Sequence, residues 1–347
     1  MSEAPALMAA PRSARRTNAE QWLYEHSPFG TLLTSILLFV VLFAGFAAAQ
    51  MLDGLSFFDP RGQVAGLNDG VWPAIVLSLM LAVILGTQHY ARARDGADTP
   101  AYAQVFRRSQ PEPDFLTAGV RRNLVIATLV GLIAGVGLTA VSVPRGVLWR
   151  HPLMMCWFVA IESMVSILFA RGIVMSTRSN ELFSRSIREN LQIDLLRIDL
   201  LSVIGRNVAR TALIWFAVAA VICLFFVGHN MAVSTFVTML GAAAMGFWIF
   251  LHPMAQVHQR IRAAKQAELE RVRRSIAGLS VEAPTNGEAA SRLHGLLAYE
   301  ARIEAVREWP FDQTTALRLS AYLLIPAIPW FGQAIVQYFV ERLAHTG

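Results

Sequence analysis

Long apolar runs constrain this chain more than any other feature. They lie near 30 to 51, 71 to 90, 123 to 142, 152 to 170, 211 to 227, 231 to 251 and 315 to 340. Most approach the roughly 20 residues that a helix needs to cross about 30 Å of hydrocarbon. None alternates apolar and polar residues as membrane barrel strands do. Because backbone polar groups in lipid must be paired within their own segment, the runs predict an all-α, polytopic transmembrane bundle of six or seven spans.

The basic residues predict the orientation of these spans. Segments 1–29, 90–122, 171–210 and 252–313 hold 25 of the 30 Lys and Arg residues, and the connections on the other side hold four. Lys and Arg are retained on the cytoplasmic side of membranes. We therefore expect a multi-pass protein of the cell (inner, cytoplasmic) membrane with 1–29 as a cytoplasmic N-terminal segment.

The same charge predicts partners. Basic connectors at a membrane surface attract anionic lipid headgroups. Nucleic acid is not expected, because the basic segments mix Arg with Glu and Asp and contain few aromatic residues. We expect the lipid bilayer to be the principal partner.

Connector lengths divide the first six spans, residues 30–251, into three helical hairpins. The third pair is joined by only Gly228, His229 and Asn230, which requires neighbouring antiparallel helices. Within the predicted cytoplasmic connectors, prolines at 100, 111 and 113 predict a loop with short helices over 92–122. Apolar residues spaced three and four apart predict an amphipathic helix over 185–201, which lies either in the membrane interface or on the bundle.

Residues 252–313 are predicted to form a cytoplasmic helical hairpin. Helical stretches over 254–279 and 293–306 surround a Pro-Gly turn, and their apolar residues loosely follow a heptad. The heptad is interrupted between Ala264 and Leu269. Pairing within the chain, homo-oligomerisation and pairing with a protein partner through 254–308 all remain open.

The last apolar run, within 314–347, contains Pro326 and Pro329. Each proline removes a backbone donor and disfavours a straight helix. We expect one kinked span, with a re-entrant pair of half-helices as the alternative.

Glu162 is the sharpest candidate for a polar site, together with Ser163 and Ser166, because it lies near the middle of the fourth apolar run. An ionisable group at that depth costs about 3 kcal/mol or more. The functional interpretation is a proton or cation site, and the structural one is a hydrogen bond between helices. Other residues mark the membrane boundaries: Arg171, His252, Pro253, Trp309, Pro310 and Arg318.

Motifs of the common enzyme classes are missing from the sequence, and no cofactor or metal site is predicted. Glycines within the spans, such as Gly131, Gly135 and Gly137, indicate close helix contacts rather than nucleotide binding.

The carboxy-terminal half carries a recognisable arrangement of residues. His252-Pro253-Met254 is followed by His258 and Arg260, and Glu308-Trp309-Pro310-Phe311-Asp312 precedes a proline-containing apolar run. Ile193-Asp194-Leu195-Leu196 adds a weaker match. This arrangement resembles a group of uncharacterised bacterial integral membrane proteins. The resemblance implies a bacterial cytoplasmic-membrane location and carries no activity.

Two functions follow as hypotheses. The first is a non-enzymatic membrane protein whose cytoplasmic hairpin serves interaction, sensing or assembly. The alternative is a transporter or channel that uses Glu162.

Overall fold

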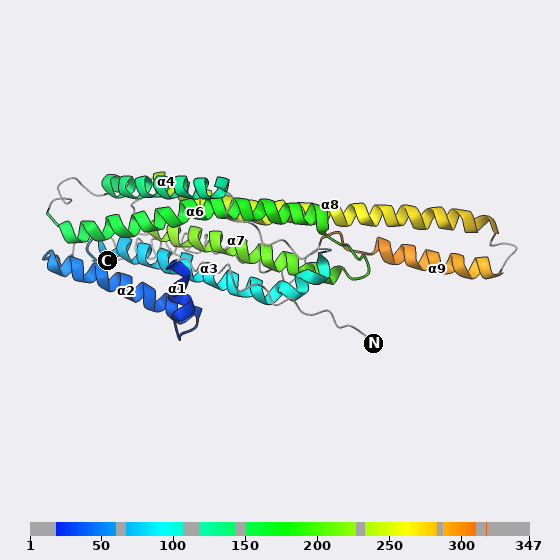
Figure 1. Ribbon diagram of the computed structural model, residues 1–347, viewed down its shortest axis with the longest axis horizontal. Coiled ribbons are helices and arrows are strands. Elements are labelled where there is room, and N and C mark those ends of the chain that lie inside the picture. The colour runs from blue at the N-terminus through cyan, green and yellow to red at the C-terminus, as the bar shows by residue number, and fades with distance from the viewer. Residues whose placement is uncertain are drawn as a thin grey trace, which may run out of the picture.

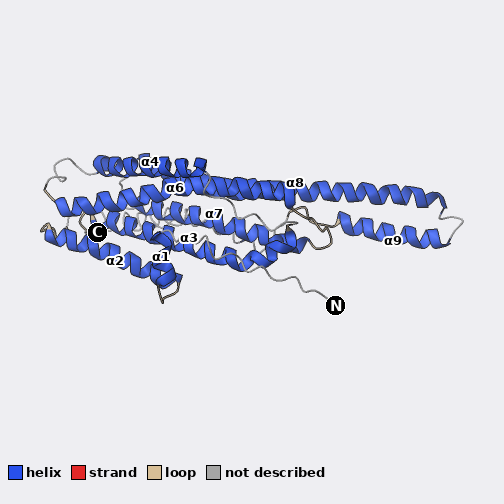
Figure 2. Ribbon diagram, in the orientation of Figure 1, coloured by secondary structure: helices blue, strands red, loops and turns tan. Residues whose placement is uncertain are grey.

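The protein is an elongated helical bundle (Figure 1). The computed structural model describes residues 19–59, 67–106, 118–142, 150–226, 233–282, 287–309 and 317. Nearly all of the described chain is helical (Figure 2), which confirms the all-α prediction. The helices are α1 (Ala19–His26), α2 (Thr31–Leu52), α3 (Val71–Val105), α4 (Ala118–Ser142), α6 (Pro152–Asn190), α7 (Ser202–Cys223), α8 (Val233–Glu282) and α9 (Gly287–Glu304), with short 3₁₀ turns at Ile198–Leu201 and Leu224–Phe226.

Six of these helices, α2, α3, α4, α6, α7 and α8, are long and apolar enough to cross a membrane. They coincide with the first six apolar runs of the sequence. The chain is therefore a multi-pass membrane protein. Apart from Leu317, the last apolar run, with Pro326 and Pro329, lies outside the described residues, as do Pro310 and Arg318.

Consecutive helices pack as pairs. Among the described helices, the most extensive contacts are α4 with α6, α7 with α8, α8 with α9, and α2 with α3. The three pairs of apolar helices are those predicted as hairpins. Helices α3 and α7 form the interior of the bundle, whereas α2 and α4 lie at its periphery, since only 11% and 22% of their apolar windows are buried.

Polar side chains join the ends of the apolar helices. Asp53 follows α2, and its carboxylate accepts hydrogen bonds from the backbone N–H groups of Met154 (2.8 Å) and Leu153 (3.4 Å) in the first turn of α6. The indole of Trp72 donates to the carbonyl of Leu224 over 2.8 Å. Because it accepts from the first turn of α6, the Asp53 carboxylate lies at the positive end of the α6 dipole.

Helix α3 differs from the predicted loop over 92–122, because it continues to Val105 with Pro100 inside it. Proline in a helix interior costs about 3 kcal/mol, so other interactions must hold this segment. Val105 and Phe106 are buried in one apolar cluster with Ile187 and Ile204. Asp98 also forms an ion pair with Arg210 of α7. This packing offsets the proline.

The amphipathic helix predicted over 185–201 is not formed as one element. Helix α6 runs on to Asn190 and ends where Leu191 becomes extended. The backbone here pairs with the end of α3, and the N–H of Gln192 donates to the carbonyl of Val105 over 3.0 Å. Asp194 then accepts the N–H of Leu196 over 2.9 Å and closes a turn. These long-range contacts override the local apolar spacing.

A second apolar cluster lies beyond the main core. It joins the ends of α3, α6 and α7 to α8, and three of its four α8 members, Met254, Val257 and Ile261, are fully buried. Helix α8 passes through this cluster without interruption at Pro253. The span and the first arm of the hairpin are therefore a single helix, with α9 alongside its far end (Figure 1).

Candidate functional site

The α8–α9 hairpin, described over residues 254–282 and 287–309, is the most organised part of the described chain outside the apolar core. Its apolar contacts come from Ile261 and Val272 of α8 and from Ile303 of α9, all of them buried. Figure 1 shows α9 running back along α8 from the far end of the molecule. The two helices thus enclose a narrow seam of their own.

Polar residues of this seam occupy the place where the heptad breaks. Tyr299 of α9 donates its hydroxyl proton to Glu268 of α8 over 3.3 Å. One turn further along α8, Arg273 donates to Glu300 (2.6 Å) and to Glu304 (2.7 Å). Glu268 therefore gives the interruption between Ala264 and Leu269 a polar contact to α9, and Arg273 adds hydrogen bonds between the arms just beyond it.

Lys265 closes the seam near the bundle. Its ammonium donates to the carbonyls of Glu304 (2.8 Å) and Val306 (3.0 Å), and the Glu308 carboxylate lies 3.9 Å away. The last carbonyls of a helix have no partner within the helix, and a cation at this end also interacts favourably with the dipole. Lys265 thus caps α9.

His258 and Trp309 meet beside this cap. Their rings stack with centroids 4.4 Å apart and planes 14° apart. His258 Nδ1 is 3.1 Å from the carbonyl oxygen of Glu308. A carbonyl can only accept, so Nδ1 carries the proton in this bond. Two parts of the motif noted in the sequence, 50 residues apart, therefore form one contact.

Glu162 lies between α4 and α6 and contacts Thr139, which sequence reasoning missed. Thr139 Oγ1 is 2.7 Å from Glu162 Oε2 and 3.0 Å from the carbonyl oxygen of Gly135. A hydroxyl has one proton, so it donates to only one of these oxygens at a time. When it donates to Gly135, a protonated Glu162 supplies the proton of the other bond. The arrangement joins the two helices.

Close backbone contact surrounds this pair. A Cβ atom added at Gly135 would lie 2.4 Å from Ser163 Cα, and one at Gly131 would lie 2.6 Å from Ile167 Cα. Ser163 is buried, and its hydroxyl has no hydrogen-bond partner in the described part of the chain. Ser166 contributes its backbone carbonyl to the contact with Gly131. Glu162, Ser163 and Ser166 therefore share one helix interface.

The remaining boundary residues lie apart from Glu162. Arg171 is one residue beyond the apolar run of α6, and Pro253 is inside α8. His252 stacks on Trp248 with centroids 5.6 Å apart, and its Nε2 lies 3.0 Å from Gln256 Nε2. Among the described residues, no group of three or more His, Cys, Asp or Glu side chains could hold a metal ion.

Comparison with known proteins adds no functional information: no protein-family model, curated protein or solved structure matches the chain.

Proposed function

We propose that this protein is a non-enzymatic component of the bacterial cytoplasmic membrane, in which the α8–α9 hairpin is a rigid arm that docks another protein chain. The single observation that carries the proposal is the uninterrupted course of α8 from the apolar bundle to the far end of the hairpin. The charge distribution of the sequence favours a cytoplasmic position for this arm.

Stiffness distinguishes an arm from a flexible tether. The part of α8 beyond Pro253 spans about 40 Å at 1.5 Å per residue. Its partner helix is held by the Tyr299–Glu268 bond and by the Lys265 cap. A pre-organised surface loses less conformational freedom when it binds a partner, so this construction suits docking.

A strip along α9 that no described residue covers provides the docking surface. It consists of exposed, mostly small residues on one helix face, namely Ala290, His294, Leu297, Ala298 and Ala301 of α9 and Ala305 just beyond its end. Small residues let a second helix approach closely, and Leu297, 47% exposed, supplies an apolar anchor. The occupant that fits this strip is a helix of another chain, and the first candidate is the α9 helix of a second copy.

Site-specific photocrosslinking of the full-length protein in its native membrane tests the proposal. A photoreactive residue at Leu297 is expected to give a discrete crosslinked product. The matched control is the same residue at Ser275, exposed on α8 away from the strip. The arm proposal is refuted if Leu297, Ala298 and Ala301 all give only the uncrosslinked monomer.

Transport through Glu162 is supported less well. Glu162 is engaged by Thr139 within a close helix contact, and neither of the two pockets described below is lined by it. Measurement of proton or cation flux in liposomes decides this alternative. Flux through the wild-type protein that is lost in the Glu162→Gln variant would support a transporter and contradict the docking-arm proposal.

A further inference from the structure

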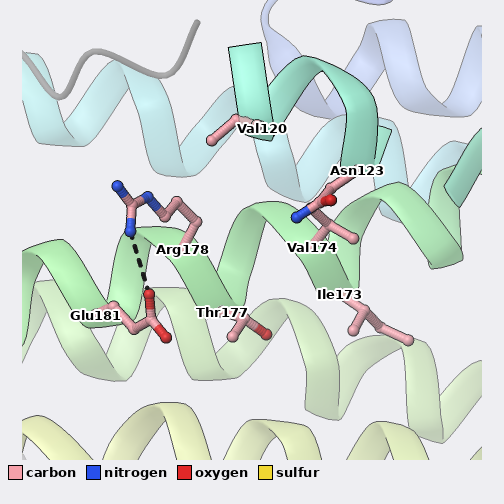
Figure 3. A pocket seen from close by; sticks show the side chains of 8 residues that line it. Val120, Asn123, Ile173, Val174, Thr177, Arg178 and Glu181 are labelled. Carbon is pink, nitrogen blue, oxygen red and sulfur yellow. Dashed lines mark hydrogen bonds and ion pairs between the residues drawn. The ribbon is translucent and has the colours of Figure 1, made fainter. Parts of the chain in front are cut away.

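A groove runs along α6 at the end of its apolar run. Its first part, about 450 Å³, lies between Val120 and Asn123 of α4 and Ile173, Val174 and Thr177 of α6 (Figure 3). Its second part, about 300 Å³, reaches His252 of α8. Both parts are lined by Arg178 and Glu181, so we treat them as one feature, the α6 groove.

Cations predominate in the second part of the α6 groove. Arg178, Arg185 and Arg188 line it, and the lining carboxylate is Glu181, which is 3.3 Å from Arg178. Glu189 lies 4.0 Å from Arg185 but does not line the groove. Arg188 makes no ion pair with any described residue. The lining therefore has a net positive charge.

Buried polar atoms in the groove have no partner within the described chain. Ser184 is 1% exposed and lines the second part, yet its hydroxyl makes no hydrogen bond. The buried Nε of Arg178 is also without a hydrogen-bond partner there. Buried donors are normally satisfied, so such atoms require an explanation. An acceptor bound in the groove would provide one once these buried groups turn toward it.

The order of the lining matches a phospholipid. The first part lies where the apolar run of α6 gives way at Arg171, and Val120, Ile173 and Val174 provide apolar contact there. The second part lies further along α6, level with the end of the apolar run of α8 at His252. Apolar and basic linings thus follow one another along α6, as acyl chains and phosphate do in a lipid.

We propose that the α6 groove binds the phosphate of an anionic phospholipid. Arg188 and Arg178 donate to its oxygens, Ser184 donates its hydroxyl, and Ile173 and Val174 contact the first acyl carbons. Arginine suits this task, because its planar fork presents several donors to phosphate oxygens at once. A free phosphate offers the same oxygens without the acyl chain. The site is independent of the proposed docking arm, since none of its residues lies on α9.

Lipid binding to the full-length protein can be counted by native mass spectrometry from detergent micelles. We expect phosphatidylglycerol to be retained more tightly than phosphatidylcholine. Arg188→Gln should weaken phosphatidylglycerol binding about tenfold, the size expected for loss of one charge-assisted hydrogen bond. Ser184→Ala should also weaken it, without lowering the melting temperature, because that hydroxyl has no partner in the described protein.

Arg206→Gln provides the matched control, since Arg206 is exposed on α7, in the same predicted cytoplasmic connector, and does not line the groove. An equal loss of lipid in this control would show that diffuse surface charge, rather than the α6 groove, binds the lipid. Equal retention of phosphatidylcholine would also overturn the proposal. Displacement of the lipid by millimolar inorganic phosphate would identify a site for the free anion instead.

Discussion

Substitution of Gly135 by alanine tests the contact that holds α4 to the bundle. The added Cβ would lie 2.4 Å from Ser163 Cα and 2.7 Å from Ser163 N. These are backbone atoms of α6, so no rotamer change can relieve the overlap. Restoring an ordinary contact distance requires α4 to move away from α6 by about 1 Å, since packed interiors have no spare volume.

Overpacking of this kind costs about 1 to 3 kcal/mol in well-packed interiors. The cost should fall in full on the α4–α6 pair, because no other described helix makes comparable contact with α4. Gly137 provides the control in the same helix, since a Cβ there would meet nothing within 4 Å. Alanine at that position should be neutral or should gain up to about 1 kcal/mol from its helix propensity.

The measurement is the free energy of unfolding of each variant in mixed micelles, followed by circular dichroism during denaturing-detergent titration. Gly135→Ala should be less stable than wild type, and Gly137→Ala should not. Equal stability of the two variants would refute the close approach of α4 and α6, and with it the assignment of Glu162 to a helix interface.

Three further substitutions test the polar contacts. Asp53→Ala should lower the free energy of unfolding by about 1 kcal/mol, because Met154 N–H loses its cap acceptor, whereas Asp53→Asn should retain most of the stability. Lys265→Met should speed hydrogen exchange in the last turn of α9 but not in α4, since only the α9 carbonyls lose a donor; unchanged exchange would refute the cap. Thr139→Val should cost about 0.6 kcal/mol of unfolding free energy, the average for hydrogen bonds between membrane helices, and a gain in stability would contradict the interface role of Glu162.

Sequence reasoning located the spans because their signal is local. Apolar run length alone identified α2, α3, α4, α6, α7 and α8, and the distribution of Lys and Arg predicted their orientation without tertiary information. The course of α3 through Pro100 was missed because the packing of Val105 and Phe106 on Ile187 comes from distant parts of the chain. The end of α6 at Asn190 was missed for the same reason, since the pairing of Leu191 with Phe106 outweighs the helical spacing.

Only some residues of each polar site could be predicted from the sequence. Glu162 was found because a carboxylate in an apolar run is conspicuous, but nothing near it in sequence identifies Thr139. The spacing of Gly131 and Gly135 did indicate a close helix contact, and the structure confirms it, whereas Gly137 faces open space. Lys265 and Glu268 were visible in the sequence only as an interruption of the heptad. In the structure both residues form polar contacts with the second arm of the hairpin.

Pro253 invites an interpretation as a hinge between bundle and hairpin, and the packing argues against it. Proline removes one backbone hydrogen bond from α8, but Met254, Val257 and Ile261 follow it and are fully buried in the second cluster. A bend at Pro253 would draw these side chains out, at a cost of about 1.5 to 3 kcal/mol each. That total far exceeds the loss of one hydrogen bond, about 1 kcal/mol. The hairpin therefore leaves the bundle in a fixed direction, and a chain docked on α9 would be held at a set distance from the membrane.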